Sequence, residues 1–322
     1  MRTLNVYYLR AHTYTIVPRQ IAEDMKWMAE AGTNIVSIAV LEQDFTAAVE
    51  NIRIICEEAH RHGMRAFAVP SRWAGLVAGA PKVPSLYSCQ NPGGWILERD
   101  GRPLLSPFSG VISSVHAPDT LRFFSSCIDR LFETWPFDGF ILDEPKGFAA
   151  DYSPAALSVL GATPSLDEFE QSAVDFYERV LQHSKLNHPD KETWMFIHAN
   201  KRDFLVNACA KIVGLDVYGC DGRPWRIADE GENEEPGKVL LDANQGERFL
   251  QAAKQNGKQS LWLIENHNMR RQDYELMDRR LPDLFTHAVD NLIYYYYPRN
   301  LENPELAMEI MRNHILRSRE NG

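Results

Sequence analysis

The sequence Phe137-Asp138-Gly139-Phe140-Ile141-Leu142-Asp143-Glu144-Pro145 contains a short apolar run that stops at two acids and a proline. The run Gly139–Leu142 has the length and composition of a fully buried strand. Pro145 cannot donate to a strand ladder, so the chain must leave the sheet directly after the acids. Two carboxylates at the rim of a buried strand are costly unless they are hydrogen-bonded or line a polar cavity. An α/β barrel carries its catalytic groups at this position.

Short apolar runs alternate with longer segments of helical periodicity along the rest of the chain. The predicted strands are Leu4–Leu9, Asn34–Val40, Met64–Val69, Gly139–Leu142, Thr193–Ile197, Ile212–Tyr218, Gln259–Ile264 and Asn291–Tyr297. The predicted helices are Pro18–Gly32, Ala47–His62, Pro118–Thr134, Ser165–Ser184, Phe204–Lys211, Asn244–Asn256, Tyr274–His287 and Pro304–Arg317. Such alternation builds parallel sheets with helical crossovers. The pattern shows no linker and no composition shift, and therefore predicts a single (β/α)8 TIM barrel over residues 1–322.

Three local features refine this prediction. The passage Ser71–Pro118 is rich in Gly, Pro and Ser and predicts a long irregular loop after the third strand. Connections of this length are usually functional or disordered, and the aromatic content argues against disorder. Ser165 and Glu168 have the spacing of a helix capping box. Pro282 predicts a kink or a break in its helix.

Composition excludes several classes of function. The chain has 322 residues, of which 44% are apolar, and a formal charge of −10. This suits one barrel with a sizeable core and disfavours a nucleic-acid partner. The five cysteines are odd in number and scattered without a CxxC pair, which indicates reduced thiols and no zinc site. The first strand is followed by Arg10-Ala11-His12-Thr13 where a dinucleotide-binding fold would have a glycine-rich loop. We therefore expect no cofactor.

The ends of the chain and its hydropathy predict where the protein resides. Met1 is followed almost at once by a strand-like segment, without the apolar core of a signal peptide. No apolar run approaches the roughly 18 residues that a membrane span needs. The sequence therefore predicts a cytoplasmic protein with no membrane partner.

Ionisable and aromatic residues follow nearly every predicted strand. In a barrel, these strand ends converge on one mouth. The residues at the ends are Arg10, His12, Glu42, Arg72, Trp73, Asp143, Glu144, His198, Asn200, Tyr218, Asp221, Glu265, His267 and Tyr294–Tyr297.

Two of these acids have the arrangement needed to cleave a glycosidic bond. That reaction uses one carboxyl to protonate the leaving oxygen and another to attack or to activate water. Glu144-Pro145 at the end of the fourth strand, with Glu265 at the end of the seventh, resembles the large barrel superfamily of retaining glycoside hydrolases. The resemblance implies that Glu144 is the acid/base and Glu265 the nucleophile. Glu144 as a helix cap or ion-pair partner, and Glu265 as a solvated strand-end acid, are the structural alternatives.

The resemblance also bears on two neighbouring residues. Asp143 stands where the family usually has an asparagine that contacts the sugar 2-hydroxyl. Asp143 could take over that contact, support it from behind, or be the working acid itself. Tyr218 lies where the family often has a tyrosine that hydrogen-bonds to the nucleophile.

Further strand-end residues are candidates for binding the sugar. His12, Arg72, His198, Asn200 and His267 carry groups that can hydrogen-bond to hydroxyls. Trp73 could stack a flat apolar ring on a sugar face, because it directly follows a strand. Structural roles are the alternative for the histidines, and packing beneath the long loop is the alternative for Trp73.

The sequence thus predicts a retaining glycosidase that acts on small oligosaccharides or glycosides. Such an enzyme should raise the pKa of Glu144 and keep Glu265 ionised. Its two carboxyls should lie about 5–5.5 Å apart, whereas about 6.5–9.5 Å would indicate inversion. One alternative is a metal-dependent barrel enzyme, such as a sugar isomerase or aldolase, with ligands from Glu42, Asp143, Glu144, His198 and His267. The other is a barrel that binds carbohydrate without catalysis.

Overall fold

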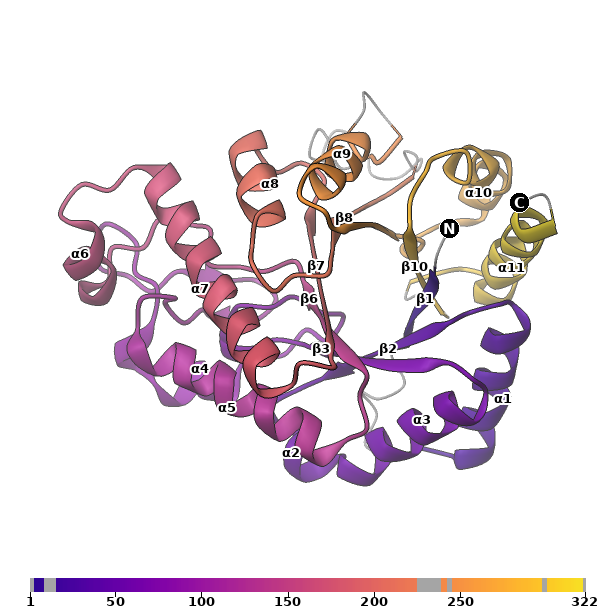
Figure 1. The fold of residues 1–322 in the computed structure, drawn as a ribbon, viewed down its shortest axis with the longest axis horizontal. Helices are drawn as coiled ribbons and strands as arrows, with labels where there is room; N and C mark the ends of the chain where they lie inside the picture. The colour runs from indigo at the N-terminus through magenta and orange to yellow at the C-terminus, as the bar shows by residue number, and fades with distance from the viewer. Residues whose placement is uncertain (1–2, 9–15, 225–238, 242–244, 297–299, 321–322) are drawn as a thin grey trace.

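The computed structural model describes residues 3–8, 16–224, 239–241, 245–296 and 300–320. Within this part of the chain, eight parallel strands form a closed barrel in the order β1-β10-β9-β8-β7-β6-β3-β2. The first strand pairs with the last, Thr3 opposite Asn291, so the sheet has no free edge. Figure 1 shows the helices arranged around the strands in chain order. The predicted (β/α)8 barrel is confirmed.

The strands of the barrel are β1 (Thr3–Tyr8), β2 (Ile35–Val40), β3 (Arg65–Pro70), β6 (Gly139–Asp143), β7 (Glu192–His198), β8 (Val217–Gly222), β9 (Gln259–Ile264) and β10 (Asn291–Tyr295). The helices are α1 (Pro18–Glu30), α2 (Asp44–Ala47), α3 (Val49–Arg61), α4 (Leu86–Gln90), α5 (Pro118–Thr134), α6 (Pro154–Leu160), α7 (Leu166–Asn187), α8 (Asp203–Ala210), α9 (Glu247–Gln255), α10 (Arg271–Leu284) and α11 (Pro304–Glu320).

Local predictions met with different outcomes. Helix α7 begins with the predicted capping box of Ser165 and Glu168. Helix α10 runs continuously through Pro282, so the predicted break at this residue is wrong. Pro282 lies in the last turn, where the helix ends two residues later and little of the hydrogen-bond ladder remains to be disrupted. The sixth barrel strand begins at Val217 instead of Ile212, after a turn in which Gly214 has a φ of 85°.

The long passage after β3 is an ordered loop with short elements of its own. It contains the 3-10 helices η2 (Trp73–Gly75) and η3 (Pro92–Gly94), helix α4, and the hairpin β4 (Leu105–Ser106) with β5 (Gly110–Val111). Glu42 at the end of β2 holds it in place, because its carboxylate accepts hydrogen bonds from Ala74 N (3.0 Å), Ser85 Oγ (2.6 Å) and Tyr87 N (2.7 Å). The prediction of an irregular loop is therefore right for the topology and wrong for the local structure.

The interior of the barrel is filled by alternate residues of the strands. These inward-facing residues form one buried cluster: Ile35, Ala39, Phe67, Val69, Ile141, Trp194, Phe196, Val217, Leu261, Leu263, Ile293 and Tyr295. Successive side chains of a strand point to opposite faces. The inward rows therefore continue at the C-terminal ends of the strands into four polar residues, Asp143, His198, Asp221 and Glu265. The fold itself brings these four to one mouth.

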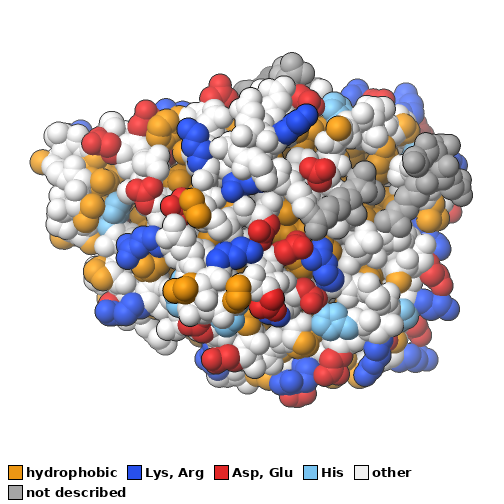
Figure 2. Space-filling model, viewed as in Figure 1, with side chains coloured by type: hydrophobic (Ala, Val, Ile, Leu, Met, Phe, Trp, Pro, Cys, Tyr) orange, Lys and Arg blue, Asp and Glu red, His pale blue; other side chains and the backbone are white. Residues whose placement is uncertain are grey.

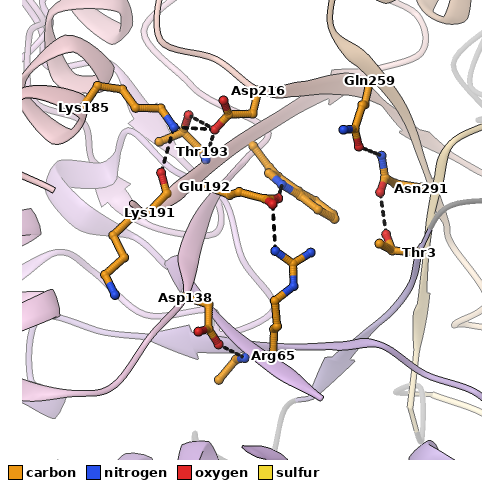
Figure 3. A network of polar contacts seen from close by, with 12 residues as sticks. Thr3, Arg65, Asp138, Lys185, Lys191, Glu192, Thr193, Asp216, Gln259 and Asn291 are labelled. Carbon is orange, nitrogen blue, oxygen red and sulfur yellow. Dashed lines mark hydrogen bonds and ion pairs between the residues drawn. The ribbon is translucent and has the colours of Figure 1, made fainter. Parts of the chain in front are cut away.

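The opposite end of the barrel, where the strands begin, carries a network of paired polar groups (Figure 3). Arg65 Nη1 lies 2.8 Å from Glu192 Oε1, and Glu192 Oε2 accepts a hydrogen bond from Trp194 Nε1 at 3.0 Å. Lys185 Nζ lies 2.6 Å from Asp216 Oδ2, which also accepts from the backbone N–H of Thr193. Each acid in this network has a cation or an N–H opposite it, so the network stabilises the barrel floor.

The outer surface shows no large region of one charge on the face drawn in Figure 2, where acidic and basic side chains are interspersed. A groove of about 410 Å³ between α7 and α8 is lined by polar and apolar residues, among them Glu178, Phe204 and Lys211. No helix in the described part of the chain is long and apolar enough to cross a membrane.

Candidate active site

The candidate site lies at the C-terminal ends of β6, β7, β8 and β9. Asp143 and Asp221 are almost completely buried, at 6% and 2% exposure. His198 pairs in register with Asp221 on the neighbouring strand, and His198 Nδ1 lies 3.5 Å from Asp221 Oδ1. These side chains therefore occupy one layer directly above the apolar interior.

Glu144 leaves the alternation of its strand. Its φ of 38° lies in the left-handed region that non-glycine residues rarely adopt, and such strain is concentrated at functional sites. The backbone turns there, and the carboxylate meets two donors: Glu144 Oε2 lies 2.6 Å from Lys146 Nζ and 2.8 Å from His198 Nε2. The strained turn thus places Glu144 beside the groups of the inward layer.

Glu144 and Asp221 share a hydrogen bond between their carboxyl groups, which requires one proton for the pair. Burial raises the pKa of Asp221 well above its usual range, and the charge of Glu144 raises it further. Burial alone would also raise the pKa of Glu144, but hydrogen bonds from His198 and Asp221 and the charge of Lys146 hold it well below the usual range. The two pKa shifts have opposite directions and favour a proton on Asp221 over one on Glu144. The expectation of a raised pKa for Glu144 itself is wrong.

Glu265 follows β9 and faces the same mouth. Burial would raise its pKa, but the nearby imidazole of His267 and the charge of Arg223 outweigh burial, and the pKa is lowered. His267 Nε2 lies 3.7 Å from Glu265 Oε1. Arg223 Nη1 donates to the backbone oxygens of Glu265 (3.3 Å) and His267 (2.9 Å), which fixes the turn after β9. The charge of Glu144 acts on Glu265, so the two carboxyls share one electrostatic environment.

Three predicted substrate contacts lie away from this layer. Tyr218 points outward from β8, is fully buried, and donates from its hydroxyl to Val206 O at 3.1 Å. Trp73 is also fully buried, and its Nε1 donates to Val40 O at 3.0 Å. Arg72 is 4% exposed and donates to carbonyl oxygens of its own loop. None of these three side chains presents a surface on which a sugar could bind.

The remaining predicted contacts are divided. His198 and His267 both lie in the site, each beside one of the candidate catalytic glutamates. Asn200 is half-buried, two residues beyond the end of β7. His12 lies outside the described residues.

One group in the site has the composition of a metal centre. Glu144, His198 and Asp221 each offer a ligand atom, and these atoms all lie within 4.8 Å of one another. Glu42, a ligand in the metal-dependent alternative, is instead bound to the long loop. These hydrogen bonds make Glu42 an anchor for the loop, and burial raises the pKa of its carboxyl.

Sequence reasoning placed Asp221 at a strand end but gave it no role, and it missed Lys146 and Arg223 as parts of the site. The alternation of inward residues could have identified Asp221, because it stands two and four positions after Gly219 and Val217 on the same face. The shifted start of β8 concealed this parity. Lys146 and Arg223 follow their strands outside any alternation, and only the folded turns show their contacts.

Comparison with known proteins supports the architecture. No family model matches the sequence, and no curated protein matches it. Among solved structures, the catalytic domain of beta-amylase from Paenibacillus polymyxa has a TM-score of 0.66 at 8% identity, with 98% of each chain covered. The endo-1,4-beta-mannanase from Rhizomucor miehei has a TM-score of 0.62 at 9% identity, over 99% of this chain and 95% of that one.

A third solved structure, alpha-L-fucosidase isoenzyme 2 from Paenibacillus thiaminolyticus, has a TM-score of 0.64 at 13% identity. The match covers 98% of this chain but only 49% of the fucosidase, so the chain spans about half of that enzyme. The chain has the (β/α)8 barrel fold of glycoside hydrolases. At these identities the likeness concerns the fold alone, and the chemistry must be argued from the site.

Proposed function

We propose that the protein is a retaining glycoside hydrolase that acts on small oligosaccharides or glycosides. The observation that carries this proposal is the division of the mouth into a carboxyl pair that holds a proton and a separate carboxylate whose pKa is lowered. Environments that push the pKa values of neighbouring acids apart assign the acid and the base of a hydrolase. In this proposal Glu265 is the nucleophile, and Glu144 with Asp221 forms the acid/base.

The two steps follow from these roles. Glu265 attacks the anomeric carbon while the proton shared by Glu144 and Asp221 passes to the leaving oxygen, so the glycosidic bond breaks and a glycosyl ester forms. The carboxyl pair then takes a proton from water, and the resulting hydroxide attacks the anomeric carbon and releases Glu265. Lys146 compensates the charge that the pair gains in the first step, because its ammonium lies 2.6 Å from Glu144.

Glu144 is the member of the pair placed to touch the substrate. Its side chain is 15% exposed, whereas the side chain of Asp221 is 3% exposed. Asp221 would pass its proton through their hydrogen bond to Glu144 as Glu144 protonates the leaving oxygen. The role of Glu144 as acid/base is thus kept, with Asp221 as the group that stores the proton.

A metal-dependent reaction is the second candidate, and the cluster of Glu144, His198 and Asp221 favours it. Carboxylate and imidazole ligands of this kind suit divalent cations. The position of Lys146 opposes it, because its ammonium already occupies Glu144 Oε2, where a cation would meet a like charge.

A panel of aryl glycosides tests both candidates, with the product anomer followed by NMR. The proposal predicts turnover of at least one glycoside with retained configuration, unaffected by a chelator, and lost in both Glu144→Gln and Glu265→Gln. Turnover that survives both substitutions would contradict the assignment. Loss of turnover on chelation would favour the metal-dependent reaction, and a native protein that binds sugars but cleaves none would be a carbohydrate-binding barrel.

A further inference from the structure

The ladder between β3 and β6 is short, although the barrel is closed. These strands pair only at Phe67 with Gly139 and at Ala68 with Phe140, whereas β2 and β3 pair along six positions. Above Phe140, the loop that follows β3 takes the place of the missing ladder. Ala78 N donates to Asp143 O at 2.8 Å.

A second bond joins the same two segments further along. Lys146 N donates to Leu76 O at 2.7 Å, so the segment Leu76–Ala78 runs beside residues 143–146 in the opposite direction. We call residues 143–146 the acid turn, because it contains Asp143, the strained Glu144 and Lys146. The loop therefore holds the acid turn at both ends on the β3 side, while on the other side Glu144 N donates to Phe196 O of β7 at 3.0 Å.

Arg72 fixes the shape of this loop. Its guanidinium is buried and donates from Nη2 to Gly79 O (2.5 Å) and from Nε to Pro81 O (2.7 Å). Its backbone N–H lies 3.1 Å from both Val77 O and Ala78 O. A planar guanidinium fork makes such paired contacts, which a lysine ammonium cannot reproduce. Arg72 thus holds the chain on both sides of Ala78.

Two further features restrict the loop after β3. Gly79 has a φ of 121°, and a Cβ there would overlap the side chain of Ser71. From behind, Tyr177 of α7 brings its hydroxyl within 2.7 Å of Leu76 O and 2.8 Å of Lys146 O. Arg72 within the loop and Tyr177 of α7 therefore both stabilise the contact between the loop and the acid turn.

We propose that Arg72 is a positioning residue for the reaction. It acts through Leu76–Ala78 on the acid turn and keeps Glu144 and Lys146 where the carboxyl pair needs them. The consequence for turnover rests on the proposed function, whereas the mechanical link from Arg72 to the acid turn does not. Displacement of a catalytic group by about 1 Å can lower turnover on the order of 100-fold.

Arg72→Met tests the proposal, because methionine keeps the apolar length and removes the guanidinium. We expect kcat to fall about 100-fold while KM changes less than about threefold, since Arg72 does not touch the substrate. Arg72→Lys should recover part of the loss. The matched control is Arg65→Met, which removes an arginine from the opposite end of the barrel and should leave kcat unchanged. Tyr177→Phe loosens the same contact without touching Arg72 and carries the test if Arg72→Met does not fold.

Amide hydrogen exchange supplies a readout that does not depend on turnover. The amides of Ala78 and Lys146 should exchange faster in Arg72→Met than in the native protein, while amides in β7 keep their rates. Unchanged exchange at both amides, unchanged kcat, or a raised KM with native kcat would overturn the proposal. If the native protein cleaves no glycoside, the proposed function fails, and the exchange experiment alone decides whether Arg72 holds the acid turn.

Discussion

Acidic residues have different partners at the two ends of the barrel. Where the strands begin, Glu192 and Asp216 each face a cation, Arg65 and Lys185, and also accept N–H bonds (Figure 3). Where the strands end, Asp143, Glu144, Asp221 and Glu265 gather at one mouth, and the ammonium of Lys146 lies 2.6 Å from Glu144. Arg223 is also there, but its Nη1 donates to backbone oxygens.

This difference separates stability from reactivity within one fold. At the floor, each charge is neutralised locally, so these residues hold strands together. At the mouth, burial and neighbouring carboxylates raise the pKa of Asp221, whereas His267 and Arg223 outweigh burial and lower the pKa of Glu265. The same substitution should therefore have different effects at the two ends.

The largest contrast is expected between Glu265→Gln and Glu192→Gln. Loss of the proposed nucleophile should lower kcat by at least about 10⁴-fold, the scale seen when a group of a catalytic unit is removed. Glu192→Gln should leave kcat unchanged and lower Tm, because Arg65 loses its charged partner. Steady-state kinetics and thermal melts of the two variants check this pair. Equal kinetic effects at both ends would contradict the division of roles.

Asp221→Asn should have the next largest effect on turnover. The variant keeps the shape of the carboxyl but holds no transferable proton, so kcat should fall about 10²–10⁴-fold. The thermal stability of the variant should rise although its turnover falls. The folded state binds the extra proton of Asp221, so this contribution is fully present below the ordinary pKa of 3.8 and is lost as the pH rises through the raised folded pKa. At pH 7 the variant should therefore melt above the native protein, and a lower melting temperature there would oppose the assignment.

Lys146→Met should have a smaller effect, which appears in the pH profile. Without the ammonium, the pKa of Glu144 should rise, so the carboxyl pair takes its second proton at higher pH and the acidic limb of kcat/KM shifts upward. The lowered pKa of Glu144 contributes stability above its ordinary value of 4.5 that is lost as the pH falls through the folded value. The variant should lose this contribution earlier on acidification. An unshifted profile would show that Lys146 does not tune the pair.

Arg65→Met should have the smallest effect and only on stability. Its partly exposed ion pair with Glu192 and its position 5.1 Å from the Phe67 ring together stabilise the fold by about 1 kcal/mol. For a chain of 322 residues that corresponds to a fall in Tm of about 1–2 °C, because unfolding entropy is about 2.1 cal/mol/K per residue. Kinetics at a temperature below both melting points should be native. A loss of turnover here would show that the floor and the mouth are coupled.

The architecture could be predicted from the sequence because hydrophobic periodicity extends over every unit of the barrel. Gln259–Ile264 and Pro118–Thr134 were predicted with the bounds that the structure shows. Periodicity does not define where a strand begins within a longer apolar run. Ile212–Leu215 has strand-like composition but lies before β8, and this shift directed attention to Tyr218 instead of Asp221.

The electrostatics of the site could not be predicted in the same way. Glu144 reaches His198 because of a left-handed backbone turn, and that turn is held by residues of the loop after β3, more than sixty positions earlier. Likewise, Arg72 and Trp73 follow β3 as the sequence suggested, yet the folding of the loop buries both. Contacts between segments far apart in the sequence determine where these side chains lie, and local sequence patterns do not predict such contacts.

The role of Glu265 admits the most direct test. A 2-deoxy-2-fluoro glycoside with a good leaving group, made for the sugar that the aryl glycoside panel identifies, should accumulate as an ester on the nucleophile of a retaining enzyme. Mass spectrometry of the digested protein should then place the adduct on the peptide that contains Glu265. An adduct on Asp143, Glu144 or Asp221, or turnover with inversion and no adduct, would contradict the account.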